Sequence, residues 1–276
     1  MIPATLSVGI VVYRPDLALL GSTLRSLRVA VDVARSDGEA ARVSVTLINN
    51  GPSEGDALHR LLASALPPEA GVDVAVMDGH GNVGYGRGHN LAIGSSRSEY
   101  HLVLNPDVVL EPDALLEGMR FLRQQPDVAL LAPEVRGEDG RLQYLCRRYP
   151  SLLVLLLRGF APPFLRRRFA GRIAWYELRD RLEEPIVRPV PLASGCFMLA
   201  RRELLAAIGG FAPDYFLYFE DYDLSLRLRR LGEIAYVRKV RITHFGGDTA
   251  RKGGRHVGMF VRSGLRFFRT HGWKLL

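Results

Sequence analysis

The chain has 276 residues, of which 47% are hydrophobic and 24% charged, and its formal net charge is +8. This length allows one large α/β domain or two small ones with a sizeable core. Its two cysteines, Cys146 and Cys196, form no spacing pattern, which argues against a disulfide framework or a zinc site and favours a reducing, cytoplasmic setting. The longest unbroken apolar run, 152–157, is far shorter than the ~20 residues of a membrane span. The start Met1-Ile2-Pro3 gives no sign of a signal peptide.

The first 133 residues are predicted to alternate between strands and helices. Near-continuous apolar strands in such an order indicate a mostly parallel, doubly wound α/β sheet. Ligands on this kind of sheet bind at the carboxyl ends of the strands, and Asn49, Asn82 and Asp107 lie at or just after such ends. The expected strands are Ser7–Val12, Val43–Ile48, Val72–Met77, His101–Leu104 and Asp127–Ala132, and the expected helices begin near Pro15, Ala57, His89 and Pro112.

The second half is less regular, and it shows no internal repeat or low-complexity linker. We expect one catalytic domain over 1–250, with a nucleotide-binding half (1–133) and an acceptor and catalytic half (134–250), followed by a basic helical extension over 251–276. The elements predicted here are a strand at Pro189–Met198, helices at Arg201–Ile208 and Asp221–Leu231, short strands at Ile234–Val237 and Val240–Thr243, and a tail helix at Arg255–Thr270.

Charge is distributed unevenly, because acidic residues are in excess up to residue 140 and arginines are in excess after it. An arginine-rich surface suits phosphate groups or an anionic membrane, and no nucleic-acid-binding motif accompanies it. In the segment 147–181 and in the tail 251–274, cations lie beside apolar and aromatic residues, including Phe260, Phe267 and Phe268. This pattern predicts peripheral contact with an anionic membrane. The alternative is an ordinary solvated face with the aromatic residues in the core.

Two segments carry groups that bind hard cations. Asn105-Pro106-Asp107 ends an apolar strand, and His244 ends another strand just before Gly246-Gly247. Oxygen ligands and a ring nitrogen suit Mn²⁺ or Mg²⁺. The alternatives are a common Asn-Pro-Asp turn and a core histidine.

Three carboxylates, Glu220, Asp221 and Asp223, follow the aromatic run 216–219. A carboxylate beside aromatic residues and other acids has a raised pKa, as a general base requires. The alternative is that acids favour a helix N-terminus. In that case Asp223 would only cap the helix, and Glu220 could still bind a substrate hydroxyl.

A glycine-rich loop runs from Gly79 to Gly88. It matches neither the Walker pattern nor the dinucleotide fingerprint, but its glycines allow close approach of the backbone to a nucleotide. We expect Asn82, Gly84 and Arg87 of this loop, together with Asn105, to contact the nucleotide.

Taken together, these segments resemble the family 2 glycosyltransferases of the GT-A fold, and among them the bacterial rhamnosyltransferases of cell-surface polysaccharide synthesis. The resemblance spans about residues 7–250 and rests on the ordered segments 7–13, 47–51, 82–90, 104–107, 193–198 and 209–229, with His244. It implies that Tyr13 and Asn49 contact the base, Asp107 and His244 hold the metal, and Asp221 is the catalytic base. The family usually has Asp at the position of Asn49, although an amide can also pair with uracil or thymine.

The resemblance implies a metal-dependent inverting glycosyltransferase that moves L-rhamnose from dTDP-L-rhamnose to a saccharide or lipid-linked saccharide. We expect it in the cytoplasm, on the inner face of the membrane. The alternatives are a UDP- or GDP-hexose transferase, a nucleotidyltransferase and a non-enzymatic carbohydrate-binding module. The nucleotidyltransferase would carry a basic glycine-rich signature near 11–15, which this sequence lacks, and the binding module would not need Asp107, Asp221 and His244 together.

Overall fold

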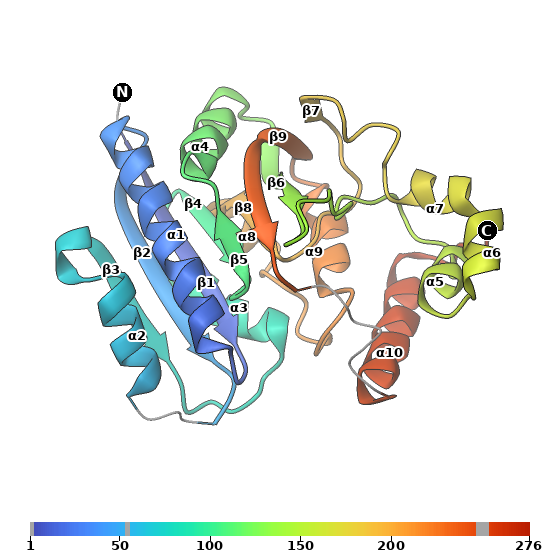
Figure 1. Cartoon of the computed structure of the whole chain (residues 1–276), viewed down its shortest axis with the longest axis horizontal. Helices are drawn as coiled ribbons and strands as arrows, with labels where there is room; N and C mark the ends of the chain where they lie inside the picture. Colours follow the sequence, from blue (N-terminus) through green and yellow to red (C-terminus); the bar gives the residue numbers. More distant parts are fainter. Residues whose placement is uncertain (1–2, 53–55, 247–253) are drawn as a thin grey trace.

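The computed structural model describes residues 3–52, 56–246 and 254–276, with residue 255 described by its backbone alone. Within these ranges a nine-stranded mixed sheet has the order β3-β2-β1-β4-β8-β6-β9-β5, and β7 pairs with β9 (Figure 1). The strands are β1 (Ala4–Val12), β2 (Ala40–Asn49), β3 (Val72–Met77), β4 (Tyr100–Leu104), β5 (Val108–Leu110), β6 (Val128–Arg136), β7 (Ile186–Val187), β8 (Phe197–Arg201) and β9 (Glu233–His244). The helices are α1 (Leu17–Ser36), α2 (Ala57–Ala65), the 3₁₀ turn η1 (Pro68–Ala70), α3 (Tyr85–Ser95), α4 (Ala114–Gln124), α5 (Leu152–Gly159), α6 (Pro163–Arg168), α7 (Ala170–Tyr176), α8 (Arg202–Ala207), α9 (Glu220–Leu228) and α10 (Gly254–His271).

The first half confirms the predicted parallel arrangement. β1 pairs in parallel with β2 and β4, and β2 pairs in parallel with β3. Because side chains alternate across a strand, Leu102 and Leu104 join the core cluster on one face of the sheet, whereas Val103 joins the cluster on the other. The sheet is therefore covered on both faces, and its strand ends remain available for a site.

The second half adds antiparallel pairing that the sequence analysis did not predict. β8 lies at 197–201 rather than at Pro189–Met198, and it runs antiparallel between β4 and β6. Pro189 and Pro191 have no N–H for a strand ladder, which is why the strand begins only after them. The two short strands predicted after residue 233 form the single strand β9, and β5 was missed because it has only three residues.

The C-terminal helix α10 packs against α9 and is part of the core. Phe267 and Phe268 are fully buried in a cluster with Tyr215, Phe219 and Tyr222. The prediction that these two phenylalanines contact a membrane is therefore wrong, and the alternative of a core position holds. The boundary predicted at residue 250 and the cations Arg251 and Lys252 lie outside the described residues. In the part of the chain that the structure describes, no helix is long and apolar enough to cross a membrane.

Asp223 joins α9 to α10 from a buried position. Its Oδ2 accepts a hydrogen bond from Arg227 Nε at 2.7 Å, and its Oδ1 lies 2.8 Å from His271 Nε2. Both Asp223 and His271 are almost inaccessible to solvent. A second ion pair, Asp214–Arg266 at 2.9 Å, also connects α10 to the body, but it lies at the surface. The two pairs therefore differ mainly in burial.

We expect Asp223→Ala to lower the free energy of unfolding by about 3 kcal/mol or more, because it leaves Arg227 and His271 without their buried partner. The matched control Asp214→Ala removes only a solvent-exposed pair and should cost less than about 1 kcal/mol. Urea denaturation of both variants measures the difference. Equal losses would show that burial does not distinguish the two contacts.

Candidate active site

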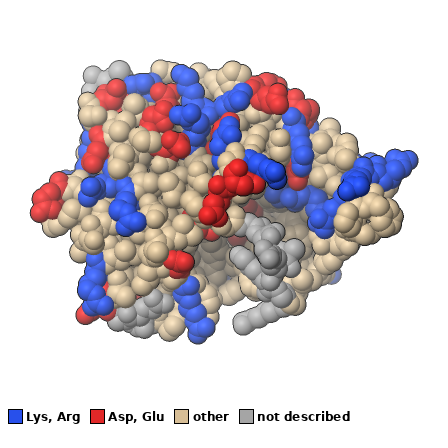
Figure 2. All heavy atoms as spheres, viewed as in Figure 1, with Lys and Arg blue, Asp and Glu red and all other residues tan. Residues whose placement is uncertain are grey.

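The site lies where the carboxyl end of β4, the segment before β8 and the start of α9 meet. The Gly195 amide donates to Asp221 Oδ2 at 3.1 Å, and the Tyr85 hydroxyl donates to the Gly195 carbonyl at 2.6 Å. The same hydroxyl lies 3.0 Å from Asn105 Oδ1. Asn105, at the end of β4, and Asp221, on α9, are thus connected through Tyr85 and Gly195. Figure 2 shows this face of the molecule hollowed at its centre, with acidic side chains along one edge of the hollow.

Asp107 and His244 face each other because β5 pairs with β9, so that the two residues stand at neighbouring strand ends. His244 Nε2 lies 3.5 Å from Asp107 Oδ1. On the other side of the ring, His244 Nδ1 lies 3.2 Å from Gln143 Oε1, and the Gln143 amide nitrogen donates to the His244 carbonyl at 3.3 Å. Gln143 Oε1 is therefore the acceptor, Nδ1 carries the proton, and the lone pair of Nε2 is directed to the Asp107 side.

This pair fits a divalent cation. A carboxylate oxygen and a histidine ring nitrogen are a common combination of metal ligands, and here the hydrogen bond to Gln143 fixes the tautomer of the histidine ring. Gly246 packs directly on the carboxylate, since a Cβ at this position would lie 2.1 Å from Asp107 Oδ2. No group of three or more His, Cys, Asp or Glu side chains forms a metal site within the described ranges. A cation here would therefore take its remaining ligands from a substrate or from water.

The two residues that precede α9 are held in an unusual backbone conformation. Tyr218 and Phe219 have φ angles of +70° and +65°, a region that bulky residues rarely adopt. Phe219 is kept there by packing, with ring centroids 5.0 Å from Phe260 and 5.3 Å from Phe267. Just before this turn, the Phe216 carbonyl accepts a hydrogen bond from the Tyr85 amide at 3.0 Å. These contacts thereby fix the direction in which the side chains of Glu220 and Asp221 project from the start of α9.

Glu220 and Asp221 occupy different environments. Asp221 is partly buried, which raises its pKa, but amide donors from Gly195 and Tyr222 and the charge of Arg147 oppose this rise. Glu220 is only 5% exposed, and its Oε2 has no hydrogen-bond partner among the described residues. Burial and the neighbouring Asp221 carboxylate raise the pKa of Glu220 to about 8. The amide donors favour the ionised form of Asp221, whereas the raised pKa of Glu220 favours its protonated form at neutral pH.

Asp223, the third acid of the cluster, does not join this pair. Arg227 and His271 use both of its oxygen atoms, so its role is structural, but it makes these two pairs rather than the helix cap considered in the sequence analysis.

Four residues predicted to contact the nucleotide have roles within the fold. Both amide atoms of Asn49 are used in the turn after β2, accepting from the Gly51 amide and donating to the Pro52 carbonyl. Asn82 accepts from the amide of Gly84, which starts α3 at a φ of +91°. Arg87 donates to the Pro213 carbonyl at 2.6 Å and so ties α3 to the segment before α9. These contacts shape the nucleotide-binding half, and direct contact with a nucleotide stays a prediction.

Tyr13 is exposed to solvent. The residue is 53% exposed, and the Arg14 guanidinium lies 5.7 Å from the centroid of its ring. The ring is therefore available to stack on a flat ligand.

A cavity of about 550 Å³ opens between α5, α9 and α10, with Glu220 and Asp221 among its lining residues. Sequence reasoning missed most of this lining, although the basic and aromatic character of 147–181 was noted. The other residues that line it are Arg147, Leu155, Arg158, Gly159, Phe160, Tyr176, Tyr218, Phe219, Tyr222, His256, Val257 and Phe260.

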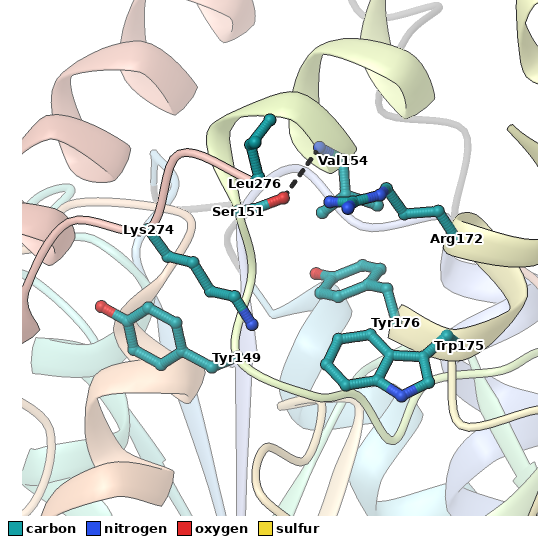
Figure 3. Close-up of a pocket in the computed structure, with 8 residues that line it drawn as sticks. All are labelled: Tyr149, Ser151, Val154, Arg172, Trp175, Tyr176, Lys274 and Leu276. Carbon is teal, nitrogen blue, oxygen red and sulfur yellow. Dashed lines mark hydrogen bonds between the residues drawn. The ribbon is translucent and has the colours of Figure 1, made fainter.

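A second cavity, of about 330 Å³, lies beside Tyr176 (Figure 3). Lys274 extends between Tyr149 and Trp175, and its Nζ lies 5.0 Å from the Trp175 ring centroid. No Asp or Glu side chain lines this cavity, so the chemistry is expected at the first one.

Residues 10–255 match the sequence pattern described as "Glycosyltransferase like family 2". An N-acetylglucosaminyl-diphospho-decaprenol L-rhamnosyltransferase from Mycobacterium tuberculosis is 30% identical in an alignment of 254 positions, which covers 84% of this chain and 76% of that protein. Rhamnosyltransferase WbbL from Escherichia coli K12 is 27% identical over 174 residues, covering 60% of this chain and 62% of that one.

Two solved structures are similar in fold. GalNAc-T7 with UDP, GalNAc and Mn²⁺ has a TM-score of 0.66 at 13% identity, and the match covers 97% of this chain and 48% of that one. A mannosyltransferase from Pyrobaculum calidifontis in complex with GDP-Man and Mn²⁺ has a TM-score of 0.58 at 15% identity, covering 96% and 65%.

The raised pKa of Glu220 predicts a stability change with pH. The folded state holds a proton up to about pH 8, whereas the unfolded chain releases it near the ordinary value of 4.5. Stability should therefore fall as pH rises from 4.5 to 8. Glu220→Gln mimics the protonated form, so relative to the wild type it should gain stability over this window, by on the order of a few kcal/mol. Urea denaturation at pH 5, 6.5 and 8 measures the gain.

The control for this titration is Glu138→Gln, which alters an exposed glutamate. It should show the same pH dependence as the wild type. A constant difference between Glu220→Gln and the wild type at all three pH values would contradict a raised pKa.

Proposed function

Because the chain belongs to the glycosyltransferase family 2 and has the GT-A fold, it is a glycosyltransferase, and we propose that it transfers L-rhamnose from dTDP-L-rhamnose to a lipid-linked saccharide. The observation that supports this chemistry best is the pair of neighbouring carboxyl groups, Glu220 and Asp221, whose environments differ, together with the Asp107–His244 pair. The choice of rhamnose follows the names of the relatives from Mycobacterium tuberculosis and Escherichia coli, and the choice of a lipid-linked acceptor follows the name of the first. The product would serve cell-surface polysaccharide synthesis.

In the proposed reaction, Asp221 removes the proton from an acceptor hydroxyl. That oxygen attacks the anomeric carbon of the donor from the face opposite to the leaving nucleoside diphosphate, so the configuration inverts. The Gly195 and Tyr222 amides hold the Asp221 carboxylate in place, and the protonated Glu220 binds a second acceptor oxygen. When bound at Asp107 and His244, Mn²⁺ or Mg²⁺ would supply the positive charge that stabilises the diphosphate.

The nucleotide is proposed to lie along the carboxyl ends of β1, β2 and β4. Tyr13 would stack on the base and Asn49 would border it, while Asn82, Gly84, Arg87 and Asn105 would line the path of the diphosphate. The solved structures of similar fold contain UDP and GDP-Man, which makes a UDP- or GDP-hexose the second candidate donor.

We expect Asp221→Asn to lower turnover by about 10²–10⁴-fold, since this is the usual contribution of a positioned general base. Donor binding should be nearly unchanged, because the substitution keeps the shape of the side chain. Release of dTDP from dTDP-rhamnose measures turnover, and calorimetry measures donor binding. Asp214→Asn, at the surface, serves as the control. A variant that retains more than about half of the rate would transfer the role to Glu220.

We expect Asp107→Ala to weaken dTDP binding strongly, and EDTA to have the same effect on the wild type. The control Asp113→Ala removes a carboxylate that pairs with Arg241 outside the site and should leave binding unchanged. Titration of dTDP with and without Mn²⁺ measures both effects. Tight binding that does not respond to EDTA would exclude the metal. Turnover with UDP-hexoses and none with dTDP-rhamnose would show that the donor is a UDP-hexose and not dTDP-rhamnose.

The helices at one end of the molecule are proposed to contact an anionic membrane. Exposed apolar residues lie on α5 and α6 (Leu156, Phe160, Phe164) and on α10 (Val257, Val261, Leu265). Exposed arginines accompany them at 166–168 and at Arg269. In Figure 2 basic side chains gather over this end of the molecule. Cations beside exposed apolar groups suit an interfacial position.

The protein should float with phosphatidylglycerol vesicles at low salt and be released at high salt. The triple variant Arg166→Gln/Arg167→Gln/Arg168→Gln should bind about 100-fold more weakly, since each cation near an anionic surface contributes about 1 kcal/mol. The matched triple variant of the exposed residues Arg25, Arg42 and Arg97, in the nucleotide-binding half, should bind like the wild type. Equal binding to neutral and anionic vesicles would contradict this surface.

A further inference from the structure

The cavity between α5, α9 and α10 contains two arginine side chains beside the catalytic carboxylates. We propose that this cavity is the acceptor site, and that Arg147 and Arg158 bind the phosphate group that links the acceptor saccharide to its lipid chain. This inference rests on the proposed function, since it assigns the acceptor to a particular place. The ligand class is a saccharide phosphate or diphosphate that carries a prenyl or alkyl chain.

The two guanidinium groups both lie against the same aromatic ring. The Cζ atoms of Arg147 and Arg158 lie 5.7 Å and 5.6 Å from the centroid of the Tyr176 ring. Two cations that line the same cavity favour an anionic ligand there. A phosphate group, with several acceptor oxygen atoms, is the ligand that arginine pairs recognise best.

Protein carboxylates compensate only part of this charge. Arg158 Nε donates to Glu177 Oε1 at 3.0 Å, but the other oxygen of Glu177 is used by Arg179 at 2.5 Å. Arg147 makes no ion pair with any described residue; its Nη1 donates to the Tyr222 hydroxyl at 2.8 Å. Of the two acids that line the cavity, Glu220 has a raised pKa, which favours its neutral form. The cavity therefore retains positive charge that an anionic ligand would neutralise.

Arg147 also connects the proposed phosphate position with Asp221, the proposed catalytic base. Its partner Tyr222 directly follows Asp221 on α9, and the positive charge of Arg147 acts on Asp221. A saccharide bound here would have its phosphate at Arg147 and Arg158 and a hydroxyl near Asp221.

The remaining walls provide for the lipid chain. Leu155, Phe160, Val257 and Phe260 line the cavity, and Phe160 is 58% exposed. Beyond the cavity, apolar residues continue along the outer faces of α5, α6 and α10, where membrane contact is proposed. A lipid chain leaving the phosphate would therefore run over apolar side chains toward the membrane.

The test is direct binding of farnesyl diphosphate in the presence of EDTA, which excludes binding through a metal at Asp107. The wild type should bind it by calorimetry, and should bind farnesol and inorganic pyrophosphate much more weakly. Arg158→Gln should raise the Kd at least about tenfold, and Arg158→Lys should restore part of the affinity. The variant is expected to fold, because Glu177 keeps Arg179 as a partner.

The matched control is Arg172→Gln, which removes a cation that lines the second cavity in Figure 3 and should leave the Kd within about twofold. No binding by the wild type would overturn the assignment. So would an equal Kd for Arg158→Gln, Arg158→Lys and the control Arg172→Gln. Pyrophosphate binding as tight as that of farnesyl diphosphate would also overturn it, since the site would then hold a free phosphate. None of these readings requires rhamnosyl transfer, so the donor assignment can fail independently.

A second measurement uses turnover. Arg158→Gln should raise the KM of a farnesyl-diphosphate-linked saccharide about tenfold and leave the KM of the octyl glycoside of the same saccharide unchanged. An equal rise for both acceptors would show that Arg158 supports the saccharide or the fold rather than the phosphate.

Discussion

The geometry of the site depends on how the first turn of α9 is held. Two consecutive residues with positive φ lead into this helix, and a conformation of that kind persists only where the surroundings impose it. Here the surroundings are the aromatic cluster under Phe219 and the buried contact of Asp223 with Arg227 and His271. Since Glu220 and Asp221 follow directly, the C-terminal helix fixes the positions of these two carboxylates, which are proposed to act on the acceptor, from more than 40 residues away in the sequence.

The parts that the sequence predicted well are those in which pattern and contact are local. Strands such as β1 and β2 have continuous apolar runs, and acids or amides at their ends had to meet at one edge of the sheet. Asp107 and His244 were each recognised from their position after a strand, but their pairing depends on β5, which is too short to give a pattern. The strand predicted at Pro189–Met198 was misplaced, because the prolines at 189 and 191 cannot donate to a strand ladder.

What could not be predicted comes from contacts between distant, irregular segments. Arg147 and Tyr222 are 75 residues apart in the chain, and Tyr85 and Gly195 are 110 apart. Contacts between residues so far apart in the chain leave no periodic pattern in the sequence. The different environments of Glu220 and Asp221 have the same origin, since they depend on which backbone amides reach one carboxylate and not the other. The composition of 147–181 indicated a binding surface, but only the fold shows that part of it faces the base.

The protonated state of Glu220 has a consequence for the choice of acceptor hydroxyl. A neutral carboxylic acid can donate a hydrogen bond, whereas the ionised Asp221 beside it can only accept one. The pair therefore presents one donor and one acceptor on adjacent residues of a rigid helix turn. A sugar with two neighbouring hydroxyl groups matches this arrangement in one orientation, with the nucleophilic hydroxyl on Asp221 and its neighbour accepting from Glu220. Regioselectivity in this enzyme would then arise from the position of a single proton.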